Sequence, residues 1–132
     1  MNNHSHSAKI MIVDDAPVNN HILKKYLKQA GYEQFVVLSD STKVIDTIRT
    51  EQPDILLLDI MMPEISGLEI LQILQSDEDW AAIPVIVLTA CDQIEVRQEA
   101  LELGAYDFLL KPIDQCDLMP RVRNALRLRH SQ

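Results

Sequence analysis

The sequence predicts an α/β fold in which five helices cover a doubly wound, five-stranded parallel sheet with the strand order 2-1-3-4-5. Five short apolar runs alternate along the chain with five segments whose apolar residues recur at helical spacing. The runs are apolar almost throughout, which is typical of parallel strands that are buried on both faces. The connections between such strands are expected to be right-handed crossovers.

Each expected strand is a short apolar run followed by polar residues. The strands are expected, in chain order, at residues 10–13, 35–38, 54–59, 85–88 and 106–110. Pro53 and Pro84 directly precede the third and the fourth strand. Because proline cannot continue a helix, both residues also mark the end of the segment before them.

The first two helices are bounded by residues that are typical of helix ends. Pro17 stands in the first turn of the first helix, where the missing N–H of proline costs little. Gly31 follows the apolar stripe of this helix and ends it, since glycine readily adopts the left-handed conformation found there. Asp40 or Ser41 is expected to cap the second helix.

The last three helices show the same periodicity. The third carries leucines at positions 68, 71 and 74, and the fourth is expected over residues 94–103 with Gly104 as its stop. The fifth runs to about Leu128 but contains Pro120, and a proline inside a helix costs about 3 kcal/mol. Asp117 is therefore the expected cap of the fifth helix, and Leu118 its first regular residue.

The composition fits one packed domain. The chain has 132 residues, of which 47% are hydrophobic and 24% are charged. We expect the domain to span residues 9–129, between a flexible N-terminal tail at residues 1–8 and a C-terminal tail or linker start at residues 130–132.

The formal net charge of -8 argues against direct binding of nucleic acid, which requires a basic face. No apolar stretch is long enough to span a membrane. We expect a cytoplasmic protein, without membrane contact, whose two cysteines are reduced thiols.

Unusual polar residues follow four of the expected strands. The first strand leads into Asp14-Asp15, the third ends in Asp59, and Thr89 and Lys111 follow the fourth and fifth. Taken singly, each has a structural explanation as a helix cap, a turn residue or a solvated lysine. In the order 2-1-3-4-5, however, the first and third strands are neighbours, and ligands of parallel sheets bind beyond these strand ends. The shared placement therefore indicates a site.

The chemistry of this set points to phosphoryl transfer. Three converging carboxylates repel one another, and one of them would protonate unless a positive charge lay nearby. Carboxylate oxygens are suitable ligands for Mg²⁺, and Lys111 adds a fixed positive charge. A carboxylate can itself attack phosphorus and form an aspartyl phosphate. The sequence therefore predicts Mg²⁺ as the cofactor.

Five motifs surround these residues. They read Ile12-Val13-Asp14-Asp15, Leu57-Leu58-Asp59-Ile60-Met61-Met62-Pro63, Pro84-Val85-Ile86-Val87-Leu88-Thr89-Ala90, Gly104-Ala105-Tyr106-Asp107-Phe108 and Leu110-Lys111-Pro112. In this combination the chain, from about Lys9 to Leu128, resembles the receiver domain of two-component response regulators, which has a flavodoxin-like fold.

The resemblance implies roles around the metal. Asp59 is the phosphoacceptor, Asp15 binds Mg²⁺ directly, and Asp14 acts through a water or assists. Met61 offers a backbone carbonyl to the metal. Met61 and Cys91 also occupy two positions beside the site that vary across the family, and neither has a carboxylate or amide to orient an attacking water. The Met61 side chain either shields the phosphoryl group or fills space in the loop.

The resemblance also implies roles around the phosphoryl group. Thr89 and the backbone of Ala90 hold its oxygens, and Lys111 pairs with them. Phe108 is the switch aromatic, which turns inward when Thr89 moves toward the phosphoryl group. The bond between Lys111 and Pro112 matches a cis peptide of the family, and only bonds to proline make the cis form cheap.

The resemblance also implies partners. A histidine kinase or a histidine phosphotransfer protein is expected to donate the phosphoryl group, and the chain is expected to catalyse only its own phosphorylation and dephosphorylation. The fourth helix, fifth strand and last helix form the family's output surface, through which a phosphorylation-dependent dimer is one expected outcome. The last helix ends in a basic stretch without a closing glycine, which predicts a longer regulator with a C-terminal output domain, such as a cyclic-dinucleotide enzyme. The alternative is a stand-alone regulator or phosphorelay receiver.

Three other classes of protein fit less well. A phosphatase of the haloacid dehalogenase type requires a second aspartate two residues after the nucleophile, but Ala16 and Pro17 stand at those positions. A nucleotide-binding Rossmann domain requires glycines after the first strand. A degenerate receiver, which binds partners without phosphorylation, has no need of the complete acidic set together with Thr89 and Lys111.

Overall fold

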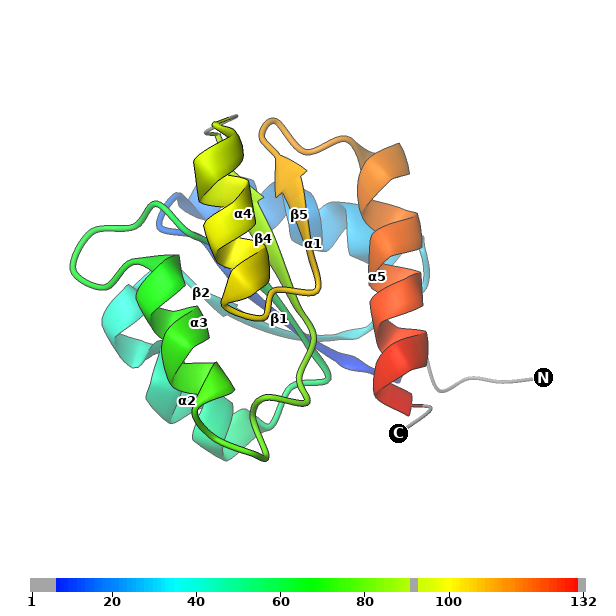
Figure 1. Ribbon diagram of the computed structural model, residues 1–132. Coiled ribbons are helices and arrows are strands. Elements are labelled where there is room, and N and C mark those ends of the chain that lie inside the picture. The colour runs from blue at the N-terminus through cyan, green and yellow to red at the C-terminus, as the bar shows by residue number, and fades with distance from the viewer. Residues whose placement is uncertain (1–6, 91–92, 131–132) are drawn as a thin grey trace.

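The computed structural model describes residues 7–90 and 93–130 and shows one parallel sheet between two layers of helices (Figure 1). The strands lie in the order β2-β1-β3-β4-β5, and all neighbouring strands are parallel. They are β1 (Lys9–Val13), β2 (Gln34–Leu38), β3 (Ile55–Asp59), β4 (Val85–Thr89) and β5 (Asp107–Leu110). The predicted fold class and strand order are confirmed.

Five α-helices cover the sheet. They are α1 (Pro17–Gln29), α2 (Val44–Glu51), α3 (Gly67–Gln75), α4 (Ile94–Glu102) and α5 (Gln115–His130). Helices α1 and α5 pack on one face, and α2, α3 and α4 on the other (Figure 1). A 3-10 turn, η1 (Ser41–Lys43), leads into α2, and the Asp40 side chain caps it by accepting the Thr42 N–H.

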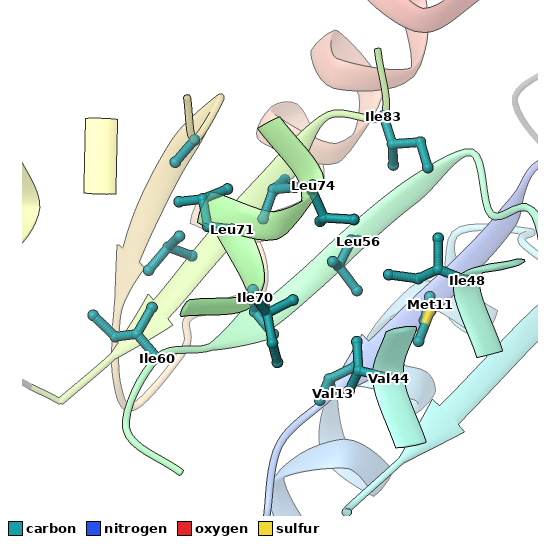
Figure 2. Packing of buried hydrophobic residues seen from close by; sticks show 14 of the residues in the cluster. Met11, Val13, Val44, Ile48, Leu56, Ile60, Ile70, Leu71, Leu74 and Ile83 are labelled. Atoms are coloured by element: carbon teal, nitrogen blue, oxygen red, sulfur yellow. The ribbon is translucent and has the colours of Figure 1, made fainter. Parts of the chain in front are cut away.

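The sheet separates two hydrophobic cores, and β3 contributes to both. All five residues of β3 are buried. Leu56 and Leu58 pack toward α2 and α3 (Figure 2 shows Leu56 beside Ile48 of α2), whereas Ile55 and Leu57 pack toward α1 and α5. Burial of each leucine contributes about 2 kcal/mol. The carboxyl end of β3 is therefore held firmly by both helical layers.

The edge strand β2 departs from the prediction that every strand is buried on both faces. Val37 is 39% exposed, and no residue of β2 is fully buried. β2 lies at the edge of the sheet and pairs with β1 alone.

Glycines end two helices as predicted. Gly31 and Gly104 follow α1 and α4 with φ angles of 100° and 99°, in the left-handed region. A Cβ atom at Gly104 would also clash with the Gln75 side chain. Pro17 is the first residue of α1, also as predicted.

Helix α5 begins earlier than predicted. The Asp114 carboxylate accepts the Cys116 N–H at 2.7 Å, and the Asp114 carbonyl accepts the N–H groups of Asp117 and Leu118, both at 3.0 Å. The prediction of Asp117 as the cap was therefore wrong, and Pro120 lies inside the helix. The helix tolerates it because Pro120 forgoes only the hydrogen bond to the Cys116 carbonyl, close to the helix start.

Among the helices of residues 7–90 and 93–130, none has the length and apolar composition needed to cross a membrane.

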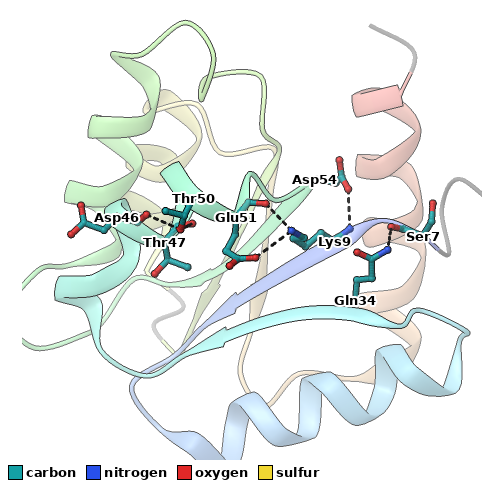
Figure 3. Close-up of polar contacts among 8 residues, drawn as sticks. All are labelled: Ser7, Lys9, Gln34, Asp46, Thr47, Thr50, Glu51 and Asp54. Carbon is teal, nitrogen blue, oxygen red and sulfur yellow. Dashed lines mark hydrogen bonds and ion pairs between the residues drawn. The ribbon is translucent and has the colours of Figure 1, made fainter.

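Polar contacts join the amino-terminal end of β1 to its neighbours (Figure 3). The Lys9 N–H donates to Asp54 Oδ2 at 2.8 Å, and Lys9 Nζ donates to the carbonyl of Glu51 at 3.0 Å. Gln34 Nε2 donates to the Ser7 carbonyl at 2.8 Å. Ala8, within the predicted N-terminal tail, is buried, whereas residues 1–6 and 131–132 lie outside the described residues.

Candidate functional site

The carboxyl ends of the central strands meet at one edge of the sheet and bring the predicted residues together. The register of β1 and β3 makes Asp14 and Asp59 neighbours. Lys111 follows β5, and its N–H donates to the Thr89 carbonyl at 2.8 Å, so the ends of β4 and β5 are tied. Four of the predicted side chains thus come from four adjacent strand ends.

A lysine bridges two buried aspartates. Lys111 Nζ lies 2.6 Å from Asp14 Oδ2 and 3.3 Å from Asp59 Oδ2. Asp14 and Asp59 are 0% and 2% exposed, whereas Asp15 is exposed. One oxygen from each of the three aspartates lies within 4.8 Å of the other two. The peptide bond between Lys111 and Pro112 is cis, as predicted.

Burial controls the charge of Asp59. The pKa of Asp59 is raised from 3.8 to about 6: desolvation by burial is the largest cause, the Met61 N–H and Lys111 oppose the rise, and the neighbouring Asp14 charge adds to it. Burial opposes the charge on Lys111, but its contacts with Asp14 and Asp59 together raise the pKa of the ammonium group. The lysine is therefore a permanent positive charge beside a carboxylate that ionises reluctantly.

The donor set fits a hard divalent cation. Asp14, Asp15 and Asp59 place three carboxylates around one ammonium group, so at neutral pH the negative charges outnumber the positive one. All three ligands offer carboxylate oxygens, and none is a thiolate or an imidazole, which matches the preference of Mg²⁺ for oxygen ligands. Asp15 is open to solvent, so a bound Mg²⁺ could keep part of its water shell there. These three residues could hold such an ion.

Two asparagines that the sequence analysis did not single out support Asp14. Asn20 is 3% exposed, and its Nδ2 donates to the Asp14 carbonyl at 2.9 Å and to the Leu38 carbonyl at 3.1 Å. Asn19 Nδ2 donates to Asp14 Oδ2 at 3.3 Å. The available signal was a pair of amides in the first turns of a helix that follows directly on the aspartates.

The loop from β3 to α3 is fixed at both ends. The Met61 N–H donates to Asp59 Oδ1 at 3.1 Å, and Met61 is 63% exposed. Further along, Ser41 Oγ donates to the Pro63 carbonyl at 2.8 Å and accepts the Ile65 N–H at 3.3 Å. The loop therefore presents its backbone to Asp59 in a defined conformation.

Gly67 is required by close backbone packing behind this loop. A Cβ atom at Gly67 would lie 2.5 Å from the Asp59 carbonyl oxygen and 2.5 Å from Ile60 Cα. Because both are backbone atoms, the loop would have to shift. We expect Gly67→Ala to lower the free energy of unfolding by about 2 kcal/mol, measured by urea denaturation. Glu69→Ala, at an exposed position on the same helix, is the control. Equal stability of Gly67→Ala and wild type would contradict the tight packing.

Thr89 and Phe108 lie on the same face of the sheet. Phe108 pairs with Val87, and alternate residues of a strand share a face, so Thr89 shares it too. Thr89 is buried, and Phe108 is half-buried against the core under α2, α3 and α4. Ala90 is exposed at the end of β4, and Cys91 lies outside the described residues.

This arrangement matches a known family. The family model for the response regulator receiver domain matches residues 10–123 of this chain. The chain belongs to this family. Over 125 residues, the receiver domain is 36% identical to the DNA-binding dual master transcriptional regulator RpaA of Synechocystis sp., a match that covers 90% of this chain and 49% of RpaA. Over 123 residues it is 39% identical to the response regulator PleD of Caulobacter vibrioides, covering 93% of this chain and 27% of PleD.

Solved structures agree with the assignment. The receiver domain superposes on that of the Francisella response regulator 1452 with a TM-score of 0.85 at 28% identity, covering 96% of this chain and 100% of the other. A putative response regulator from Chloroflexus aurantiacus gives a TM-score of 0.86 at 28% identity, with coverages of 92% and 98%. The match thus covers nearly all of the two solved chains but half or less of RpaA and PleD.

Proposed function

We propose that this receiver domain accepts a phosphoryl group on Asp59 from a histidine kinase or a histidine phosphotransfer protein, with Mg²⁺, and thereby switches a partner-binding surface. The observation that carries the proposal is the position of Asp59. Its carboxylate is buried at the end of β3, 3.3 Å from Lys111 Nζ and within 4.8 Å of two further carboxylates. An oxygen nucleophile beside fixed positive charge suits attack on a phosphoryl group.

In the proposed step, a carboxylate oxygen of Asp59 forms a bond to phosphorus. The P–N bond to the donor imidazole breaks, and its electron pair stays on the imidazole nitrogen. Negative charge is spread over the three other phosphoryl oxygens in the transition state. Lys111 balances part of it, and the Thr89 hydroxyl and the Ala90 N–H are the donors that we assign to the remaining oxygens. Hydrolysis of the aspartyl phosphate later restores Asp59, so the chain catalyses changes only to itself.

We assign the metal to Asp14, Asp15, Asp59 and the backbone carbonyl of Met61. When bound, Mg²⁺ supplies positive charge to the phosphoryl oxygens and offsets the repulsion among the carboxylates. Asp14 already accepts the Ala16 N–H at 2.9 Å and contacts the site lysine at 2.6 Å, whereas Asp15 is exposed. Asp15 is therefore the more available direct ligand, and Asp14 the assisting one.

We expect Asp15→Ala to weaken Mg²⁺ binding more than Asp14→Ala does, as measured by calorimetric titration. Binding to the wild type should be weak, because few protein oxygens contribute and waters complete the coordination. Asp46→Ala removes an equal charge from the exposed surface of α2 and should leave the titration unchanged. A wild type that shows no response to Mg²⁺ would contradict the metal assignment.

A labelling experiment tests the function itself. Acetyl phosphate and Mg²⁺ should add one phosphoryl group per chain by intact mass, and proteolysis should locate it on the peptide that contains Asp59. Removal of Mg²⁺ with EDTA should suppress the gain. If the folded, Mg²⁺-loaded chain gains no mass from the donor, the proposal is wrong.

We also propose that the domain is the N-terminal part of a longer cytoplasmic regulator with a C-terminal output domain. The length of its relatives supports this, since the match covers 49% of RpaA and 27% of PleD. The surface of α4, β5 and α5 is the one we assign to output, including a phosphorylation-dependent dimer. Because this chain carries a net charge of -8, any DNA contacts of such a regulator would be made by the output domain. An open reading frame beyond Gln132 supports the longer regulator, and a stop codon there favours the stand-alone alternative.

A further inference from the structure

An arginine of α4 covers the aromatic ring of Phe108. The guanidinium carbon of Arg97 lies 5.0 Å from the ring centroid, inside the range of about 6 Å at which a cation is attracted to an aromatic face. Both side chains are half-buried, so less water competes with the contact than at a fully exposed site. The contact links α4 directly to the residue that we assign as the switch.

A second arginine holds the backbone of the same strand. Nε of Arg121, on α5, lies 3.1 Å from Asp107 Oδ2. The other oxygen of the Asp107 carboxylate accepts the Phe108 N–H at 2.8 Å. These two contacts connect α5 to the backbone at Phe108, while α4 covers the ring. Rotation of the Phe108 side chain would carry the ring away from the present position of the guanidinium.

We propose that Arg97 is a positioning residue that holds the Phe108 ring in its present place and sets how readily phosphorylation moves it. The inference rests on the proposed function, because phosphorylation of Asp59 is the event that it regulates. Thr89 lies on the same face of the sheet as Phe108. A shift of the Thr89 hydroxyl toward a phosphoryl group frees space beside the ring, and the ring enters this space only by leaving the guanidinium.

The effect on phosphorylation follows from thermodynamic linkage. If phosphorylation favours the inward ring position, the inward position must favour phosphorylation by the same factor. A cation–π contact of this kind shifts an equilibrium by about fivefold. Removing it should therefore raise the phosphorylated fraction by up to about fivefold, at a donor concentration that labels only a small part of the wild type.

The test compares four chains at low acetyl phosphate with Mg²⁺. Arg97→Met keeps an unbranched apolar stem and removes the charge, Arg97→Lys retains a cation, and Arg127→Met removes an exposed charge from α5. We expect more phosphorylation in Arg97→Met, and wild-type levels in Arg97→Lys and Arg127→Met. Circular dichroism checks that each variant is folded. Arg97→Gln replaces Arg97→Met if the latter does not fold.

The ring itself can be followed by fluorine NMR. The chain has only two phenylalanines, so 4-fluorophenylalanine gives one signal for Phe108 and one reference signal for Phe35. In the wild type the donor should move the Phe108 signal. In Arg97→Met the unphosphorylated signal should already be shifted toward the phosphorylated position, so that the donor changes it less, while the Phe35 signal stays constant.

A double-mutant cycle separates a role in holding the ring from a general effect on the domain. In a Phe108→Leu background, Arg97→Met should have no further effect on phosphorylation, because the contact is already absent. The inference is overturned if Arg97→Met labels like the wild type and the donor changes its Phe108 fluorine signal as it does in the wild type. It is also overturned if Arg97→Met raises labelling equally in the Phe108→Leu background.

If no chain takes up phosphoryl, the proposed function fails. The fluorine signal then decides the inference alone: a Phe108 ring that gains motion in Arg97→Met supports it, and an unchanged signal overturns it.

Discussion

Asp59→Asn should abolish phosphoryl uptake by this chain. An amide oxygen is a far poorer nucleophile than a carboxylate oxygen, and the variant keeps almost the same shape. We assign the other two carboxylates of the site, Asp14 and Asp15, to the metal and expect neither to replace Asp59 as the acceptor. Intact mass after incubation with acetyl phosphate and Mg²⁺ measures the effect.

The matched control for this experiment lies next to the other end of the same strand. Asp54 precedes β3 and accepts the Lys9 N–H through its carboxylate at 2.8 Å, a role that an amide oxygen can keep. Asp54→Asn should therefore label like the wild type. Uptake by Asp59→Asn at the wild-type level would show that another residue is the acceptor.

The second large effect concerns stability without Mg²⁺. Burial raises the pKa of Asp59 from 3.8 to about 6, so between these values the folded chain binds more protons at this residue than the unfolded chain does. The contribution of Asp59 to the free energy of unfolding must then fall as the pH rises from about 4 to about 6. The shift corresponds to about 3 kcal/mol, because one pKa unit is worth about 1.4 kcal/mol.

Asparagine does not titrate, so the free energy of unfolding of Asp59→Asn should not show this decrease with pH. In EDTA at pH 7 the variant is expected to be more stable than the wild type by up to about 3 kcal/mol, with little difference near pH 4. Urea denaturation of both chains across this range isolates the effect, because the other carboxylates are common to both. Mg²⁺ should narrow the difference in stability at pH 7, because it stabilises the ionised wild-type site more than the site of the variant, which lacks one carboxylate ligand. A gap that is constant with pH would contradict the role of burial at Asp59.

Much of the fold and the site could be read from local patterns. Apolar runs gave the strands, and Gly31 and Gly104 marked helix ends because left-handed backbone favours glycine. Asp14, Asp59 and Lys111 were recognisable because each occupies the end of an apolar strand, and parallel strands place such ends at one edge of the sheet.

Two kinds of feature could not be read in this way: the choice between residues that compete to cap the same helix, and contacts between residues far apart in the sequence. Asp114 and Asp117 are both plausible caps for α5, and only the geometry shows that the Asp114 carboxylate reaches the Cys116 N–H. Arg97 and Phe108 are separated by a loop and lie on different elements, so no helical or strand spacing relates them. Their contact emerges only when α4 packs beside β5.

The burial of β3 has a consequence for how such domains diversify. All five residues of β3 are buried, so any change in the four apolar residues before Asp59 must be accommodated by one of the two cores. The outer surfaces of α1 and α4, where Val18 and Ile94 are 69% and 58% exposed, are under no such restriction. Substitutions should therefore be accepted far more readily at these exposed helix positions than within the strand that carries Asp59.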